Sequence, residues 1–166
     1  MGIWEYDWEP FEIVTNDGYT LTLMHVTKKS GPFHSGPDKD MAPIVVMPPM
    51  GSNPHMWLEA YLYPSPPDNP MHFKLRDAGH DLWFTYSRGT DYSLKHESYA
   101  PDSKEFWDFS WEQMGTGDLR AAVDYVHAAT GQKVGLMGYS MGTTQIFAAM
   151  SLEYDSFFKD RVYKVA

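Results

Sequence analysis

Cysteine is absent from the 166-residue sequence. The chain therefore forms no disulfide, offers no thiolate to a metal and has no cysteine nucleophile. It also lacks any run of 18 consecutive apolar residues, so the sequence predicts no transmembrane segment. Positive charge is scarce, because 13 Lys and Arg stand against 22 Asp and Glu and give a formal net charge of −9. This balance argues against nucleic acid as a partner, since nucleic-acid binders usually present a basic face.

We expect any targeting peptide to be absent or already removed. The first residues have neither the basic start nor the apolar stretch of a signal peptide, and no Asn in the chain is followed by the Ser or Thr that N-glycosylation needs. What is present is an apolar content of 43% and an aromatic content of 16%, which is typical of a globular protein. We expect residues 1–166 to belong to one domain.

The order of apolar runs predicts an α/β fold. Residues 11–26 alternate as two short strands around an Asp-Gly turn, which indicates an antiparallel hairpin. Apolar runs at 43–47, 80–85 and 133–137 predict buried strands, and we expect them to be parallel and adjacent. Helices are predicted from residue 71 to a stop at Gly79, from a cap at Asp118 to Gly131, and over 143–150. Proline-rich residues up to 70 predict a loop, and the run at 162–166 resembles a further strand.

Residues 138–142 read GYSMG, a G-x-S-x-G motif between an apolar strand and an apolar helix. On such a turn the serine is held in a strained backbone conformation with its hydroxyl exposed, and the glycines let strand and helix approach closely. Ser140 would also lie at a helix N-terminus, where free N–H groups favour developing negative charge. The sequence therefore predicts Ser140 as a nucleophile, and the alternative is an ordinary strand-to-helix loop.

Five blocks of sequence resemble the acid lipases of the α/β-hydrolase superfamily, the group that contains gastric and lysosomal acid lipases. The blocks cover nearly the whole chain and occupy residues 15–21, 77–89, 106–110, 130–132 and 138–144. The resemblance implies the N-terminal half of an α/β-hydrolase fold, with a hairpin leading into a mainly parallel sheet, helices on both faces and an incomplete C-terminal side. It implies hydrolysis of a lipid ester without a metal or organic cofactor. By resemblance alone the compartment would be lysosomal or secreted.

One departure from the family lies in the loop after the first buried strand. The family has His-Gly there, whereas this chain has Pro48 and Pro49. In the family, the backbone N–H that follows completes the oxyanion hole together with the N–H after the nucleophile, so the resemblance implies Met50 and Met141 as the donors. Proline has no N–H, so Met50 must supply this donor. The two prolines could also shift the loop enough to weaken the oxyanion hole.

A second departure concerns the base. These hydrolases carry their acid and histidine after the nucleophile, but all seven histidines of this chain lie at or before residue 127. Without a base, a serine hydroxyl stays protonated and is a poor nucleophile. None of these histidines shows metal-ligand spacing, and we expect them to be packing or surface residues. Asp155 and Asp160 follow the motif but are expected to be solvated charges.

We therefore expect a serine ester hydrolase whose Asp and His come from polypeptide outside this chain, as a complementary C-terminal segment or chain. The first alternative is a catalytically inactive, hydrolase-like subunit with a structural or interaction role, because a fold alone does not carry a function. The second is an enzyme truncated by gene modelling or by the choice of boundaries. A half-fold should expose a sheet edge and apolar helix surface.

Overall fold

An antiparallel hairpin opens the computed structural model, which describes residues 6–28, 40–52 and 71–166. Strands β1 (Tyr6–Val14) and β2 (Tyr19–Lys28) form this hairpin. In the turn, Thr15 Oγ1 accepts a hydrogen bond of 2.9 Å from the Tyr19 N–H, and Gly18 has a φ of 95°. A positive φ is what the Asp-Gly pair supplies in a tight turn. The hairpin prediction is confirmed, and both strands are longer than residues 11–26.

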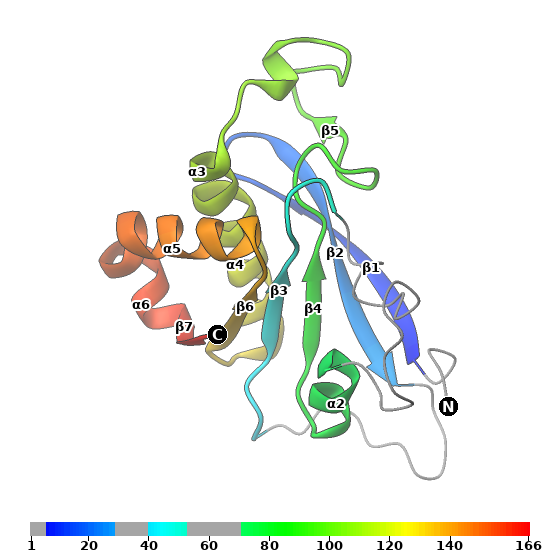
Figure 1. Ribbon diagram of the computed structural model, residues 1–166, viewed down its shortest axis with the longest axis vertical. Helices are drawn as coiled ribbons and strands as arrows, with labels where there is room; N and C mark the ends of the chain where they lie inside the picture. Colours follow the sequence, from blue (N-terminus) through cyan, green and yellow to red (C-terminus); the bar gives the residue numbers. More distant parts are fainter. Residues whose placement is uncertain (1–5, 29–39, 53–70) are drawn as a thin grey trace.

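The hairpin continues into one mixed sheet, which has seven strands in the described part of the chain (Figure 1). Its order is β1-β2-β4-β3-β6-β7, and the short β5 (Lys95–His96) pairs with β2. Strand β3 (Ile44–Met47) pairs in parallel with both β4 (Leu82–Thr85) and β6 (Val134–Gly138). The last strand, β7 (Val162–Val165), pairs in parallel with β6. The prediction of three parallel, adjacent buried strands is therefore confirmed.

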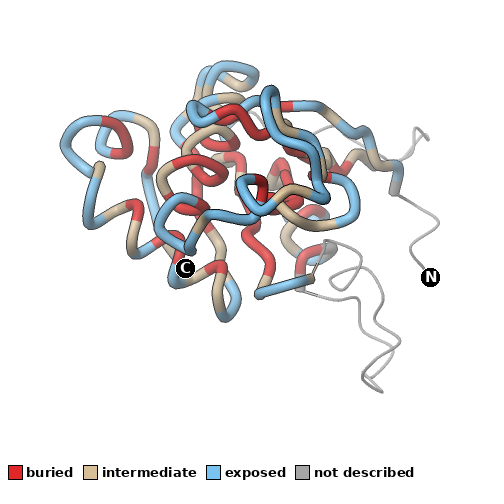
Figure 2. The backbone as a smooth tube through the Cα atoms, turned by 90° about the horizontal axis from the view of Figure 1, so that it is seen from above, coloured by how far each residue is buried: buried red, intermediate tan, exposed pale blue. Residues whose placement is uncertain are grey.

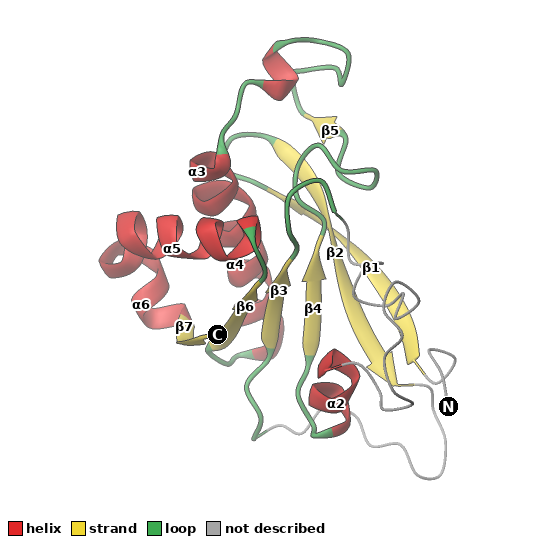
Figure 3. Ribbon diagram, viewed as in Figure 1, coloured by secondary structure: helices red, strands yellow, loops and turns green. Residues whose placement is uncertain are grey.

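Alternating side chains of these strands form two separate apolar layers. Val45, Met47 and Trp83 point to the face that packs against the long helices, whereas Val46 and Phe84 point to the opposite face. That opposite face also packs against Leu75 of helix α2 (Met71–Asp77), which ends just before Gly79, where φ is 104°. Figure 2 shows the buried residues running through the middle of the molecule, and Figure 3 places α4 and α5 beside β6 and β3.

The helix expected to begin at Asp118 begins earlier in the structure. After a short 3₁₀ turn, η3 (Glu105–Trp107), one continuous helical run consists of α3 (Trp111–Gln113), the π-helical η4 (Met114–Leu119) and α4 (Arg120–Thr130). Ser110 begins it with a capping box, in which its side chain accepts from the Glu112 N–H and the Gln113 side chain accepts from the Ser110 N–H. Gly131 ends it in the left-handed conformation, as predicted.

The prediction of Asp118 as the helix cap was therefore wrong. Asp118 lies inside the helical run and is completely buried, because its carboxylate pairs with Arg88 rather than with backbone N–H groups of the helix. The apolar face of this helical run consists of Leu119, Ala122, Val123 and Val126, which are all buried.

The chain then continues through α5 (Met141–Glu153), the π-helical η5 (Tyr154–Phe158) and α6 (Lys159–Arg161) into β7. In the described ranges no helix has both the length and the apolar character that crossing a membrane requires. The loop predicted in the proline-rich residues up to 70 falls largely outside the described residues.

Replacement of Ser110 and of Asp118 by alanine tests this assignment of the cap. We expect Ser110→Ala to lower the free energy of unfolding by about 1 kcal/mol, the usual contribution of a cap. Asp118→Ala should lower it by about 3–5 kcal/mol, because it leaves the buried charge of Arg88 without its main partner. Urea denaturation measures both values, and equal losses would contradict the assignment.

His72 predicts a dependence of stability on pH. Burial lowers the pKa of His72, which packs edge-on against Phe84, from 6.5 to about 4. The unfolded chain therefore binds a proton near pH 6.5 that the folded chain resists, so this group makes stability fall as the pH drops from 6.5 toward 4. Between pH 7 and pH 4.5 the free energy of unfolding should decrease in both proteins. We expect the decrease to be about 2 kcal/mol smaller in His72→Leu than in the unaltered chain. Parallel pH slopes of the two proteins in urea denaturation would refute this.

Candidate active site at the strand-to-helix turn

Ser140 occupies the turn between β6 and α5, as the motif predicts. Its φ of 54° and ψ of −119° make it the one non-glycine residue with positive φ among those described. The side chain is exposed and is not packed into the core. Such a conformation is strained for a residue with a Cβ, by about 1–3 kcal/mol, and strain of this kind is concentrated at functional sites.

The two motif glycines are required by close contacts. A Cβ at Gly138 would lie 2.7 Å from the backbone nitrogen of Thr143, and one at Gly142 would lie 2.4 Å from the carbonyl oxygen of Met47. Both distances are too short for a side chain. The glycines therefore bring the start of α5 against β6 on one side and against the end of β3 on the other.

The loop after β3 forms a tight turn despite its two prolines. The Ser52 N–H donates a hydrogen bond of 3.2 Å to the Pro49 carbonyl, and Gly51 has a φ of 64°. A glycine with positive φ at the third position is the arrangement of a type II turn. The hydrogen bond that closes the turn is donated by Ser52, so it does not use the Met50 N–H. Met50 itself is exposed.

Met50 and Met141 line the same cavity of about 400 Å³. Met141 is the first residue of α5, and the first N–H groups of a helix have no acceptor within the helix. The other walls are mostly apolar and aromatic, and they come from the loop after β4, from η3 and the residues after it, and from the start of the long helical run. The described residues that contribute them include Ser87, Arg88, Gly89, Thr90, Trp107, Phe109, Trp111 and Met114.

No described histidine lines this cavity. His25 lies beside β4, with Nε2 2.6 Å from Asp81 Oδ1 and its ring stacked on Trp83. Asp81 precedes the first residue of β4, whereas the cavity lies beyond the last, so this pair is at the other end of the sheet from Ser140. Three further ring nitrogens lie near backbone carbonyls, those of His80, His96 and His127. His34 and His55 fall outside the described residues.

The two aspartates that follow Ser140 in the sequence lie near the C-terminal end of the described chain. Asp155 and Asp160 are exposed in η5 and α6, as expected of solvated charges. Asp155 lies 4.0 Å from Lys159, one helical turn away.

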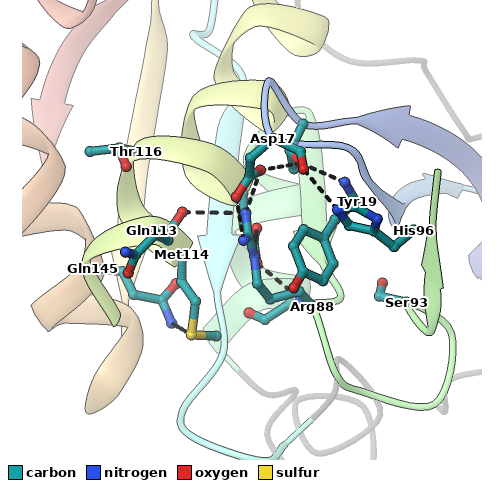
Figure 4. Close-up of polar contacts among 12 residues, drawn as sticks. Asp17, Tyr19, Arg88, Ser93, His96, Gln113, Met114, Thr116 and Gln145 are labelled. Atoms are coloured by element: carbon teal, nitrogen blue, oxygen red, sulfur yellow. Dashed lines mark hydrogen bonds and ion pairs between the residues drawn. The ribbon is translucent and has the colours of Figure 1, made fainter. Parts of the chain in front are cut away.

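A buried ion pair behind the cavity was not anticipated from the sequence. Arg88, fully buried, donates from Nε to Asp118 Oδ1 at 2.6 Å and from its backbone N–H to Asp118 Oδ2 at 2.9 Å. Its Nη1 and Nη2 donate to Asp17 at 2.6 and 3.0 Å (Figure 4). The Tyr19 ring lies 4.0 Å from the guanidinium carbon. A charged residue three positions after a buried strand is the one signal that could have indicated this pair.

The surroundings shift the pKa values of the Asp118 and Asp17 carboxylates in opposite directions. Complete burial raises the pKa of Asp118 to about 6, against the opposing effect of the Arg88 charge. Burial would also raise the pKa of Asp17, but hydrogen bonds from Arg88 and Thr15 outweigh it and leave that pKa below its usual value. Arg88 itself stays charged.

The strain at Ser140 can be measured by substitution. Glycine adopts a positive φ without a Cβ penalty, so we expect Ser140→Gly to raise the free energy of unfolding by about 1 kcal/mol relative to Ser140→Ala, which keeps the Cβ. Thermal or urea unfolding of the two variants makes the comparison. An alanine variant as stable as the glycine variant would show that the turn carries no strain.

Comparisons with known proteins agree with this geometry. No family model matches the chain. Gastric triacylglycerol lipase of Mus musculus is 36% identical over 156 residues, which cover 89% of this chain and 36% of the lipase. Triacylglycerol lipase 2 of Arabidopsis thaliana is 30% identical over 149 residues, which cover 90% of this chain and 34% of that lipase. The chain thus spans about a third of the length of these curated relatives.

Solved structures agree in fold. An esterase of Pyrococcus furiosus matches 89% of this chain and 47% of its own with a TM-score of 0.57 and 18% identity. An epoxide hydrolase of Vigna radiata matches 99% of this chain and 40% of its own with a TM-score of 0.58 and 13% identity. The chain is accordingly similar to the acid lipases over nearly its whole length, and its fold is a partial α/β-hydrolase fold.

Proposed function

We propose that this chain is the nucleophile-bearing part of a serine carboxylic ester hydrolase that acts on lipid esters. The observation that carries the proposal is the strained, exposed Ser140 at the N-terminus of α5, next to a cavity that Met50 and Met141 share. A serine in this conformation at a strand-to-helix turn is the geometry of a nucleophile elbow. The largely apolar cavity walls suit an acyl chain, and they support a lipid ester as the substrate.

Each residue has a defined step in the proposed reaction. A base takes the proton of the Ser140 hydroxyl as Oγ attacks the ester carbonyl carbon. The N–H groups of Met50 and Met141 stabilise the resulting oxyanion. The intermediate expels the alcohol, which receives the proton from the base, and leaves an acyl group on Ser140. Water then attacks the acyl group, again with help from the base, and releases the carboxylic acid while Ser140 regains its proton.

The base and its acid partner are assigned to polypeptide outside this chain. In support, the cavity lining includes no described histidine, and β7 is an edge strand of the described sheet, paired with β6 alone. Next to β7, a largely apolar hollow of about 220 Å³ lies among residues that include Ile44, Met137 and Tyr163. Phe147 and Leu152 on α5 are also exposed. We assign these surfaces to a complementary C-terminal segment, with residues 1–166 as the N-terminal part of one hydrolase domain.

The second candidate function is a catalytically inactive, hydrolase-like subunit. The observation that favours it is Pro48-Pro49, which replaces His-Gly of the family in the oxyanion loop. Against it, the turn after these prolines is closed by Ser52 and leaves the Met50 N–H out of its hydrogen bond. Activity of the assembled protein distinguishes the two functions.

The first test is activity with and without the downstream polypeptide. We expect residues 1–166 alone to lack turnover of short-chain p-nitrophenyl esters, because serine, base and acid act as a unit. With the downstream segment, activity should appear, and Ser140→Ala should lower kcat by about 10⁴–10⁶-fold. Full activity of the short chain, abolished by Ser140→Ala, would place the base within these residues. An inactive but well-folded assembly would favour the structural role.

The second test removes one oxyanion donor without moving the loop. Met50 is the second residue of the turn closed by Pro49 and Ser52, a position that proline favours. Met50→Pro deletes the N–H, so we expect kcat of the assembled protein to fall about 100- to 1,000-fold. Met50→Ala keeps the N–H and should lower kcat at most a few-fold. Equal effects of the two substitutions would exclude Met50 as a donor.

A further inference from the structure

The Arg88 cluster, made of Arg88, Asp118 and Asp17, joins three elements that are far apart in the sequence. Arg88 follows β4, Asp118 belongs to the π-helical η4, and Asp17 lies in the turn of the first hairpin. The guanidinium donates from Nε to Asp118, from Nη1 and Nη2 to Asp17, and from Nη2 also to the Gln113 carbonyl at 3.4 Å (Figure 4). The cluster therefore fixes the relative positions of the three elements.

Gly117 shows how tightly the elements close around Arg88. A Cβ at this position would lie 2.3 Å from Arg88 Nη2 and 3.2 Å from Asp17 Oδ1. The π-helical stretch can therefore approach the guanidinium only because residue 117 has no side chain. A fork of two carboxylates around one arginine also gives a fixed geometry that a lysine ammonium cannot reproduce.

Two of these elements, the loop after β4 and η4, also line the cavity beside Ser140. Arg88 and its neighbour Gly89 line it from the loop after β4, and Met114 lines it from η4, one turn before Asp118. Trp107 forms another wall and packs on Gly89, where φ is 81° and a Cβ would lie 2.6 Å from the indole ring. The position of Arg88 therefore determines where Trp107 and Met114 stand relative to each other.

Stability alone is a weak reason for such a cluster. Removing two charges from water costs several kcal/mol each, and well-packed apolar residues often replace a buried ion pair without loss. Unlike apolar packing, the cluster holds its elements in one defined geometry. In this fold that geometry sets the shape of the cavity.

We propose that Arg88 is a positioning residue that keeps the cavity beside Ser140 in the shape that accepts an acyl chain. The inference rests on the proposed ester hydrolase function of the same site. Arg88 does not react with the substrate. It acts through Trp107, Gly89 and Met114, so its replacement affects long acyl chains more than short ones.

The test compares two esters in the assembled protein that contains the downstream polypeptide. The measured quantity is the ratio of kcat/KM for p-nitrophenyl octanoate to kcat/KM for p-nitrophenyl acetate. Arg88→Lys keeps the charge but loses the fork. We expect it to lower the ratio about tenfold, chiefly through KM for the octanoate, because loss of about two buried methylene contacts has this effect on binding.

Two further variants keep the outcome decisive. Val126→Ala truncates a buried α4 residue that does not line the cavity, so it lowers stability and should leave the octanoate-to-acetate ratio unchanged. Asp17 is 39% exposed on its side chain, so Asp17→Asn perturbs the cluster mildly, and we expect about a threefold lower ratio. If Arg88→Lys does not fold, the ratio measured for Asp17→Asn tests the proposal in its place.

An unchanged ratio in the folded Arg88 or Asp17 variant, or the same decrease in Val126→Ala, would overturn the positioning role and leave the proposed function intact. Absence of Ser140-dependent hydrolysis in the unaltered assembly would overturn both.

Discussion

The close approach of α5 to the end of β3 is the contact on which the rest of the site depends. Gly142 permits it, because any side chain there would collide with the Met47 carbonyl. The Tyr139 N–H donates to that same carbonyl at 3.3 Å, so the turn that bears Ser140 is attached to the strand that leads into Met50. Parallel pairing places Met47 opposite Gly138 in the sheet. The proposed nucleophile Ser140 and the loop that bears Met50 thus follow two neighbouring strands of the sheet, as expected where open α/β sheets assemble their sites.

Local signals in the sequence were sufficient for much of this arrangement. The Asp-Gly pair at 17 and 18 specifies a turn, the unbroken apolar runs specify buried parallel strands, and the motif at 138–142 specifies a strand-to-helix turn. Each depends on backbone preferences or on periodicity, which are properties of a few adjacent residues. The parallel order followed because apolar strands joined by helical crossovers usually neighbour one another.

What the sequence could not show depends on partners that are distant along the chain. Asp118 resembles a helix cap when only its neighbours are considered, but its actual partner is Arg88, 30 residues earlier. Ser110 begins the helix because of the capping box with Gln113, and the π-helical stretch with its two glycines made the true start hard to recognise. The effect of Pro48 and Pro49 was open for a different reason, because two adjacent prolines do not by themselves specify the turn that Gly51 and the Ser52 N–H form after them.

The strained backbone of Ser140 also bears on the balance between stability and activity. Relief of strain at a functional site is a common case in which a stabilising substitution lowers activity. At residue 140 the relieving substitution is glycine, which adopts the positive φ without a Cβ clash but has no hydroxyl group. The residue that would make this turn most stable therefore differs from the residue that the proposed reaction needs.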